Sequence, residues 1–341
     1  MSAWAPPDDW VRLTTIDAHT AGEPLRVVTD GFPDLPGDTI LAKRRYARDH
    51  YDHLRRTLIL EPRGHADMYG CVLTPPATSD GDVGVLFLHN EGFSTMCGHG
   101  IIGLVKVGLE CGLIDAGEDG RIRIDTPAGR VTAVASIENG RVTGVSFLSV
   151  PSFATALDQV VDVEGLGRVH YDVAFGGAFY AYVDGPSVGL ELGSKNTPEI
   201  IDAGMRIKRA VAEREPIHHP AGEPDLDFLY GTIFVERFDA GDVHSCNVCV
   251  FAEGEVDRSP TGTGVSGRAA IHHTRGELST GEWITIESLI GTQFQVRVYE
   301  TTEVAGVPAV VPEVRGTAHI TGRNEFLVDP DDPLAEGFLL R

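Results

Sequence analysis

The chain has 341 residues, 42% of them hydrophobic, which is enough for two domains with sizeable cores. Its formal net charge of −22 makes nucleic acid and anionic membrane surfaces poor partners. There is no apolar run of 18 residues and no basic-then-apolar leader, and five cysteines are too few for a disulfide framework. We therefore expect a cytoplasmic protein with reduced thiols.

The first half of the chain is predicted to be rich in strands. Runs bounded by glycine, proline, aspartate and asparagine predict strands at 26–33, 57–62, 84–90, 121–137 and 142–150. A charged amphipathic pattern predicts a helix over 41–59, and a second helix is expected to follow Cys97 as far as about Gly112. A domain boundary is expected near 150–154.

The second half repeats this composition. Strands are predicted at 172–184, 230–238, 247–254, 282–299 and 318–328. Helices are predicted over 198–214 and from Thr261 to about Arg275. Many short strands, two of them leading into glycine-opened helices, indicate an α/β protein.

An internal repeat links the two halves. Thr261 follows Cys97 at an offset of 164 positions (261 minus 97). The same offset relates four further pairs, which are Glu91 and Glu255, Gly98 and Gly262, Gly100 and Gly264, and Gly103 and Gly267. A predicted strand precedes each motif, and a segment with an acid, a hydroxyl and a glycine follows it. The repeat predicts two α/β domains of one design that face each other.

Cys97 is the first candidate for catalysis. It directly precedes a glycine-opened helix, so unpaired backbone N–H groups and the positive end of the helix dipole are expected near its sulfur. Such a setting lowers the pKa of a thiol and makes thiolate available near neutral pH. The adjacent His99 and the absence of bulky neighbours favour this interpretation over a buried, inert cysteine. Cys71 and Cys111 lack these features and are expected in the core.

The Gly-x-Gly-x-x-Gly pattern in each repeat resembles a dinucleotide-binding fingerprint. In that fingerprint the first glycine closes a tight turn directly after a strand, whereas here several polar residues separate the strand from the glycines. The glycines are better suited to bring backbone amides close to a small anion such as an amino-acid carboxylate. Asp257, four residues before Thr261, is either a helix cap or the partner of a ligand ammonium group. Together these groups would match a zwitterionic amino acid.

Other candidate motifs are weaker. The pair Cys246 and Cys249 lies in a predicted strand without a second cysteine pair, so no zinc site is expected. The double histidines at 218–219 and 272–273 lack metal-ligand spacing. His19 is expected to organise a loop near the site. We predict no metal.

Five stretches, at 16–28, 61–70, 88–100, 172–184 and 256–268, resemble the proline racemase family, and the resemblance covers nearly the whole chain. It implies a diaminopimelate epimerase-like fold, in which two pseudo-symmetric domains each wrap a curved sheet around a central helix and the active site lies in the cleft between them. The implied domains are 1–152, which carries Cys97, and 153–324, which carries Asp257 and Thr261. A C-terminal segment of about 325–341 would return to the first domain.

The resemblance also implies site residues. In the racemases and epimerases of the family both motif positions are cysteine, whereas this chain has Thr261 at the second. A cysteine and threonine pair resembles the subgroup of trans-3-hydroxy-L-proline dehydratases, and it implies that Cys97 accepts the α proton of an imino acid. Substrate binding is implied for Gly98, His99, Asp257, Gly262 and Thr263, and pocket walls are expected at Tyr69, Phe87 and Phe251.

The expected function is therefore cofactor-independent dehydration of a small imino acid, with no nucleic-acid or membrane partner and a homodimer as a guess. Three alternatives stay open. A 4-hydroxyproline epimerase or proline racemase is disfavoured by Thr261, because an alcohol is a poor replacement for a thiol in carbon acid–base chemistry. A protein that only binds amino acids is disfavoured by the intact motif at Cys97. A dinucleotide oxidoreductase is disfavoured by the loop spacing.

Overall fold

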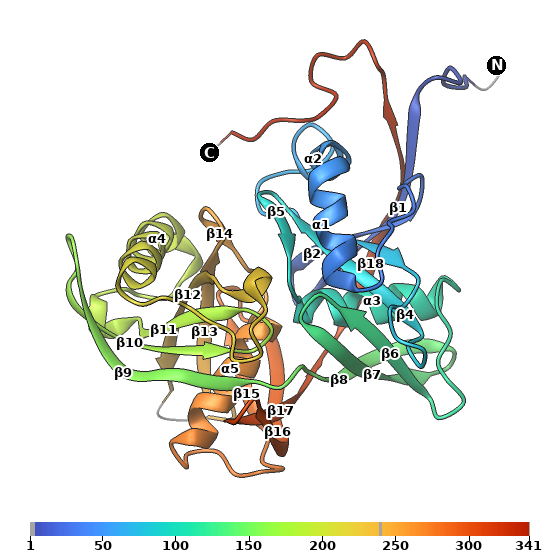
Figure 1. The fold of residues 1–341 in the computed structure, drawn as a ribbon. Coiled ribbons are helices and arrows are strands. Elements are labelled where there is room, and N and C mark those ends of the chain that lie inside the picture. The colour runs from blue at the N-terminus through green and yellow to red at the C-terminus, as the bar shows by residue number, and fades with distance from the viewer. Residues whose placement is uncertain (1–3, 239–240, 341) are drawn as a thin grey trace.

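The computed structural model describes residues 4–238 and 241–340. Figure 1 shows two lobes side by side, each a curved sheet wrapped around one helix. The central helices are α3 (Gly98–Glu110) in the first lobe and α5 (Gly262–Thr274) in the second. The architecture confirms the predicted mixed α/β class, with two similar halves.

The sheet of the first lobe runs in the order β18-β1-β2-β3-β4-β6-β7-β8, with the short β5 paired to β4. Its strands are β1 (Val11–Thr20), β2 (Glu23–Asp30), β3 (Gly70–Thr74), β4 (Val83–His89), β5 (Gly92–Ser94), β6 (Arg121–Thr126), β7 (Gly129–Glu138), β8 (Arg141–Leu148) and β18 (Ala318–Val328).

The sheet of the second lobe follows the same plan, in the order β9-β10-β11-β12-β13-β15-β16-β17 with β14 paired to β13. Its strands are β9 (Phe153–Val163), β10 (Gly167–Phe175), β11 (Phe179–Asp184), β12 (Leu229–Arg237), β13 (Ser245–Phe251), β14 (Glu255–Val256), β15 (Ile284–Ser288), β16 (Gln293–Val304) and β17 (Val307–Gly316). Antiparallel pairing of β8 with β17 joins the two sheets.

The two lobes match strand for strand around their helices. β4 pairs in parallel with β6 across α3, and β13 pairs in parallel with β15 across α5. Both helices are almost entirely buried, and apolar or small residues occupy most of their surface. Ile101, Leu104 and Val105 of α3, for example, have no exposed surface. The internal repeat in the sequence therefore corresponds to the part of each lobe that surrounds its central helix.

The remaining helices cover the outside of the lobes. They are α1 (Ile40–His50), α2 (Asp52–Ile59) and α4 (Thr197–Arg214), with 3-10 turns at Pro186–Val188, Ser194–Asn196 and Pro224–Leu226. Within the described residues, no helix combines the length and the apolar character that crossing a membrane would require. Two sequence predictions are wrong here. The helix expected over 41–59 is divided at Tyr51 into α1 and α2. No strand forms at 57–62, because residues 57–59 are the end of α2, where Leu58 and Ile59 face the core.

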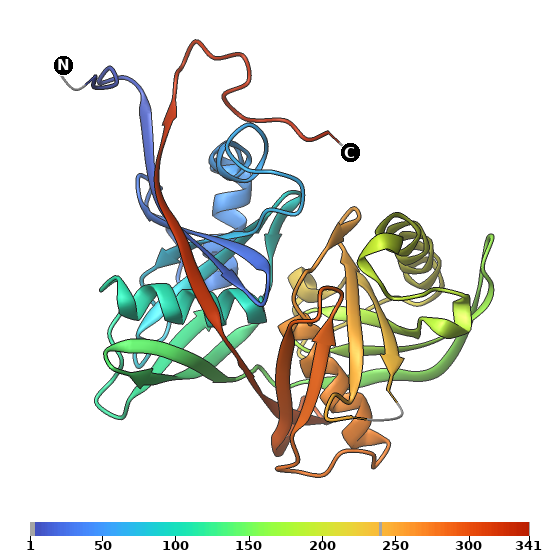
Figure 2. The same cartoon turned by 180° about the vertical axis from the view of Figure 1, so that it is seen from behind.

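Strand β18 lies in the first lobe although it follows the whole of the second lobe in sequence. It pairs with β1 from Val11↔Val328 to Thr20↔Ala318, and Figure 2 shows it running from the second lobe into the first. The segment after it reaches α2, where Arg56 forms an ion pair with Glu336 at 2.7 Å. The first lobe thus contains both ends of the described chain. The domain limits inferred from the sequence, 152/153 and 324/325, stay a prediction.

Contacts between the lobes flank the central helices. Arg45 of α1 forms an ion pair with Asp225 of the second lobe at 2.5 Å. His89 Nδ1 lies 3.0 Å from Glu255 Oε1, and the Thr95 hydroxyl donates to the Gly177 carbonyl at 2.7 Å. These contacts hold the two helix N-termini against each other.

Candidate active site

The N-termini of α3 and α5 meet at two glycines. A Cβ atom added to Gly98 would lie 2.5 Å from the Cα of Gly262, and one added to Gly262 would lie 2.5 Å from the Cα of Gly98. Any side chain at either position would push the helices apart. The glycines therefore allow two positive helix ends, with their unpaired N–H groups, to converge on one small space.

Cys97 is the N-cap residue of α3. Its backbone is extended, and its sulfur accepts a hydrogen bond from the Gly100 N–H at 3.2 Å. The His99 Nδ1 atom lies 3.1 Å from the same sulfur. Burial lowers the pKa of His99 to about 3, so its imidazole is neutral near pH 7. The thiol thus has a neutral imidazole and a backbone donor as neighbours.

The pKa of Cys97 corrects the expectation from the sequence. Burial raises the pKa of the thiol well above its usual value, and it outweighs the Gly100 N–H that favours the thiolate. The negative charge of Asp257 acts in the same direction as burial. In this closed arrangement Cys97 is a protonated thiol, because the site excludes the water that would stabilise its anion.

Thr261 holds the matching position at the start of α5. Its backbone has a positive φ of 65°, a strained value for a β-branched residue, and it makes no side-chain cap. Its buried hydroxyl has no well-formed hydrogen bond within residues 4–238 and 241–340. The hydroxyl nevertheless lies near enough to Asp257 to lower the pKa of that carboxyl group. A buried hydroxyl left in this state is available to a ligand.

Asp257 lies between β14 and α5. It is 5% exposed, and its Oδ1 accepts a hydrogen bond from the Ser259 N–H at 2.7 Å. Burial raises its pKa to about 6, although contacts with Ser259 and Thr261 favour the charged form. A buried carboxylate of this kind gains much from a positively charged ligand.

The side chains of Cys97, His99, Thr261 and Asp257 line one small cavity. It has a volume of about 20 Å³, close to the space that a single water needs. Its lining residues are Tyr69, Met96, Cys97, Gly98, His99, Tyr180, Tyr230, Phe251, Asp257, Thr261, Gly262 and Thr263. A ligand of several heavy atoms can therefore enter only when the lobes separate.

The cavity includes nine of the ten site residues expected from the sequence. The exception is Phe87, which lies behind α3, where a Cβ on Gly100 would approach its ring to 2.5 Å. Three lining residues, Met96, Tyr180 and Tyr230, are not among those expected. Tyr180 donates to or accepts from the Thr263 hydroxyl at 2.8 Å, and its place within the family-like stretch 172–184 is the signal that could have found it.

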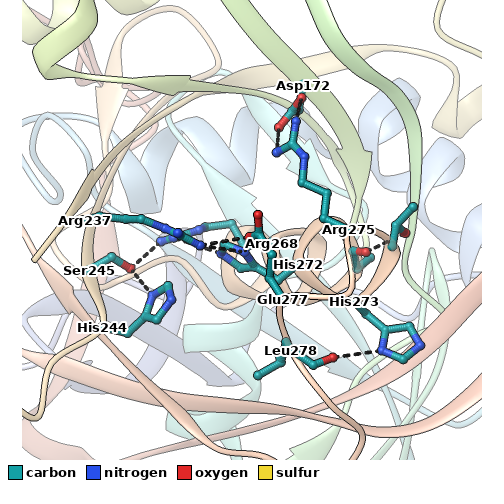
Figure 3. Close-up of polar contacts among 12 residues, drawn as sticks. Asp172, Arg237, His244, Ser245, Arg268, His272, His273, Arg275, Glu277 and Leu278 are labelled. Carbon is teal, nitrogen blue, oxygen red and sulfur yellow. Dashed lines mark hydrogen bonds and ion pairs between the residues drawn. The ribbon is translucent and has the colours of Figure 1, made fainter. Parts of the chain in front are cut away.

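The weaker motifs lie outside this cavity. The His19 ring lies 5.3 Å from that of His319 in a tilted arrangement, and its Nδ1 accepts a hydrogen bond from the Gly22 N–H. Figure 3 shows His272, at the far end of α5, in a polar network with Arg268, Arg237 and Glu277, whereas His273 contacts the Leu278 carbonyl instead. His272 contacts Glu277 at 2.6 Å and Arg268 at 3.2 Å. No group of three or more histidine, cysteine or acidic side chains in the described part of the chain is arranged to hold a metal ion.

The fold and the site define a two-lobed, diaminopimelate epimerase-like protein with a cysteine at one helix N-terminus and a cavity between two such termini. Comparison with known proteins identifies the family to which the chain belongs. The proline racemase family model matches residues 15–339, and the chain belongs to that family.

Relatives within the family carry two kinds of name. The trans-3-hydroxy-L-proline dehydratase of Colwellia psychrerythraea is 47% identical over 99% of this chain and 96% of its own length. The 3-hydroxyproline 2-epimerase of Burkholderia multivorans is 44% identical over 96% of this chain and 98% of its own length. Among solved structures, a hydroxyproline epimerase from Agrobacterium vitis with bound trans-4-hydroxy-L-proline has a TM-score of 0.90 at 32% identity, covering 97% of this chain and 96% of that one.

Proposed function

We propose that the chain is a trans-3-hydroxy-L-proline dehydratase. The unequal pair at the two helix N-termini carries the proposal, since Cys97 and Thr261 line one cavity from opposite lobes. A thiol can exchange a proton with carbon, whereas an alcohol is far too weak an acid to return one. Dehydration needs one such base and a departing hydroxyl group. Several relatives at 46–47% identity bear this enzyme name.

The proposed binding mode uses both charges of the imino acid. The ring ammonium group faces Asp257, and the carboxylate lies against the backbone N–H groups of Gly98, His99, Gly262 and Thr263. The aromatic rings of Tyr69 and Phe251 form walls for the apolar part of the ring. This arrangement holds the α carbon between residues 97 and 261.

The proposed chemistry is an elimination. The Cys97 thiolate removes the α hydrogen, the electrons of that C–H bond form a double bond between the α carbon and C3, and the C3–O bond breaks. The departing hydroxyl group, which lies on the same face of the ring as the α hydrogen, takes up the proton now held by Cys97 and leaves as water, and the thiolate is restored. Charge that develops on the substrate carboxylate is stabilised by the N–H groups of the two helix ends. The enamine product tautomerises to 1-pyrroline-2-carboxylate.

The neutral state of His99 bears on how the hydroxyl group leaves. With a pKa of about 3, His99 carries no additional proton near pH 7 that it could donate. The hydroxyl group of trans-3-hydroxy-L-proline lies on the same face of the ring as the α hydrogen, so the departing oxygen faces Cys97 and not Thr261, which lines the opposite side of the cavity.

Opening and closing of the lobes accounts for the high pKa of Cys97. The thiol can ionise in an open, hydrated site and lose its water shell when the lobes close on the substrate. Closure then makes the thiolate a stronger base, while the ring ammonium group offsets the charge of Asp257. Independence of metal and organic cofactors, a cytoplasmic location and a homodimer stay predictions from the sequence.

The deciding experiment offers the protein trans-3-hydroxy-L-proline, its cis isomer and trans-4-hydroxy-L-proline in parallel. We expect 1-pyrroline-2-carboxylate from the first compound only. Inversion of a hydroxyproline without loss of water, followed by optical rotation, would establish the second candidate, an epimerase, which the name of the Burkholderia relative supports. Binding of all three without turnover would leave only an amino-acid-binding role.

A further inference from the structure

Glu23 lies directly behind the proposed site and has no part in the chemistry described so far. It is the first residue of β2 in the first lobe, and its side chain is completely buried. Its Oε2 atom accepts a hydrogen bond from the backbone N–H of Arg258 in the second lobe at 2.7 Å. Arg258 directly follows Asp257 in the chain. A single hydrogen bond therefore joins a buried carboxyl group of one lobe to the backbone beside the proposed substrate-binding carboxylate of the other.

Positive charge around Glu23 is scarce. Its Oε1 atom is buried and has no hydrogen-bond partner among the described residues. The Arg258 guanidinium is 3.9 Å away through Nη1, while its Nη2 forms a closer ion pair with Asp67 at 3.0 Å. Other titratable groups that interact with Glu23 include Asp257 and the thiols of Cys97 and Cys249, which bring no positive charge to it.

With few positive charges and hydrogen-bond donors nearby, the ionised form of Glu23 is unfavourable. A carboxylate removed from water requires a close cation or several hydrogen bonds. Here the Arg258 side chain is shared between Glu23 and Asp67, and one backbone N–H is the single donor to Glu23 among the described residues. When two carboxyl groups share such a site, one of them keeps its proton.

We propose that Glu23 keeps its proton near neutral pH and acts as a positioning residue that leaves Asp257 as the one negative charge facing the ring ammonium group of the substrate. The inference rests on the proposed function for the identity of that ligand. As a neutral acid, Glu23 joins the lobes through a hydrogen bond without adding charge. Burial and the neighbouring Asp257 raise its pKa well above the usual value, in agreement with this assignment.

An ionised Glu23 would harm the site in three ways. It would add a second negative charge near the position of the substrate carboxylate, and it would make the Cys97 thiolate harder to form. It would also place an uncompensated charge between the closed lobes. We therefore expect ligand binding to weaken when the pH rises far enough for Glu23 to lose its proton.

The first test observes the proton itself. Infrared difference spectra at pH 7 between the wild type and Glu23→Gln should contain the carbonyl stretch of a protonated carboxyl group. The matched control Glu199→Gln removes an exposed carboxylate from α4 and should give no such band. The band that the wild type has and Glu23→Gln lacks should disappear as the pH is raised, and this comparison separates it from the carboxyl group of Asp257. A wild-type spectrum without a band that titrates in this way would overturn the proposal.

The second test measures the affinity for L-proline as a function of pH. Because glutamine matches a neutral acid in size and can accept the Arg258 hydrogen bond, Glu23→Gln should stay within about threefold of wild type at pH 7. Glu23→Asp, one methylene too short for that bond, should bind about tenfold more weakly. The wild type should lose affinity at alkaline pH while Glu23→Gln keeps it. An equal alkaline decline in both proteins would contradict a role for the Glu23 proton.

The infrared measurement needs neither turnover nor ligand. A titrating band in a protein that does not dehydrate trans-3-hydroxy-L-proline would reject the proposed function and leave the protonated Glu23 in place. Dehydratase activity in a protein without the band would support the proposed function and reject the protonated Glu23.

Discussion

Cys97, His99 and Asp257 meet in a cavity that is nearly closed to water, and burial favours the neutral form of all three. It raises the pKa of the thiol, lowers that of His99 to about 3 and raises that of Asp257 to about 6. The sequence indicates the helix N-terminus beside Cys97 but not the desolvation that opposes it. For this reason the position of Cys97 at a helix N-terminus is predictable from the sequence, whereas the direction of its pKa shift is not.

At the level of this residue, Cys97→Ser should fold and still bind L-proline. It should lose exchange of the substrate α hydrogen in deuterated water by at least about a hundredfold, because a hydroxyl group is a much weaker acid–base group. Proton NMR of the substrate measures the exchange. Cys111→Ser is the control and should retain wild-type exchange, because Cys111 follows α3 and is exposed, not in the core as the sequence predicts. Unchanged exchange in Cys97→Ser would remove this residue from the mechanism.

Asp257 should link activity and stability to pH in opposite ways. Because its pKa is raised on folding, the stability associated with its proton is present below about pH 4 and is lost as the pH rises through about 6. Asp257→Asn should therefore increase the free energy of unfolding at pH 8 by up to about 3 kcal/mol, with no gain at pH 4. Denaturant titrations at the two pH values measure this difference.

Activity should change in the other direction. In the wild type, ligand affinity should fall as the pH drops below about 6, where Asp257 gains a proton and loses its attraction for an ammonium group. Asp257→Asn should bind L-proline poorly at every pH. A stabilised variant with intact binding would show that Asp257 does not face the ammonium group.

Thr261→Cys tests the asymmetry of the pair. A second thiol on the opposite side of the cavity can return a proton to the other face of the α carbon, so we expect weak epimerisation of hydroxyproline together with a lower dehydration rate. Optical rotation and product analysis on the same sample separate the two outcomes. Because placement to a fraction of an ångström decides such transfers, a small rate is expected. Thr261→Ser, which keeps the hydroxyl group, should give no epimerisation.

At the scale of elements, the contact between α3 and α5 depends on the absence of side chains at their first residues. Gly262→Ala should separate the helix N-termini, shift residue 261 relative to Cys97, and lower kcat/KM by about a hundredfold, since a shift of about 1 Å costs that much. Gly92→Ala is a suitable control, because a Cβ there meets no atom within 4 Å. Equal activity of the two variants would show that the helix contact does not set the geometry.

The repeat at an offset of 164 predicts both central helices and gives residues 97 and 261 matching positions, as the fold has them. Other elements have weaker signals in the sequence. Strands β1, β3, β9 and β17 are not predicted. Polar residues interrupt the apolar pattern of β1 and β9, prolines interrupt that of β17, and β3 has only five residues. The run at 282–299 is predicted as one segment but is divided by a turn between β15 and β16. Tyr230 reaches the cavity from β12 through tertiary packing, for which its sequence neighbours give no pattern.

At the scale of the whole molecule, a cavity of about 20 Å³ requires the lobes to move apart for every turnover. The ion pair between Arg45 and Asp225 lies across their outer junction. Surface pairs of this kind contribute about 0–1 kcal/mol, so Asp225→Ala should speed alkylation of Cys97 by iodoacetamide by up to about fivefold. Asp202→Ala, which removes an ion pair within α4, is the control and should leave the rate unchanged.

Addition of L-proline should slow alkylation in all three proteins, because the ligand favours closed lobes. Mass spectrometry of the modified peptide distinguishes Cys97 from the exposed Cys111. Alkylation of Cys97 at the rate of an exposed thiol, with or without ligand, would mean that the lobes do not close over the site.

The position of β18 affects how the protein is made on the ribosome. All strands of the second lobe have been synthesised before residues 318–328 emerge, whereas the first lobe still lacks the strand beside β1. The half of the molecule that is translated first must therefore be completed last, and until then the growing polypeptide leaves the edge of β1 open to other chains.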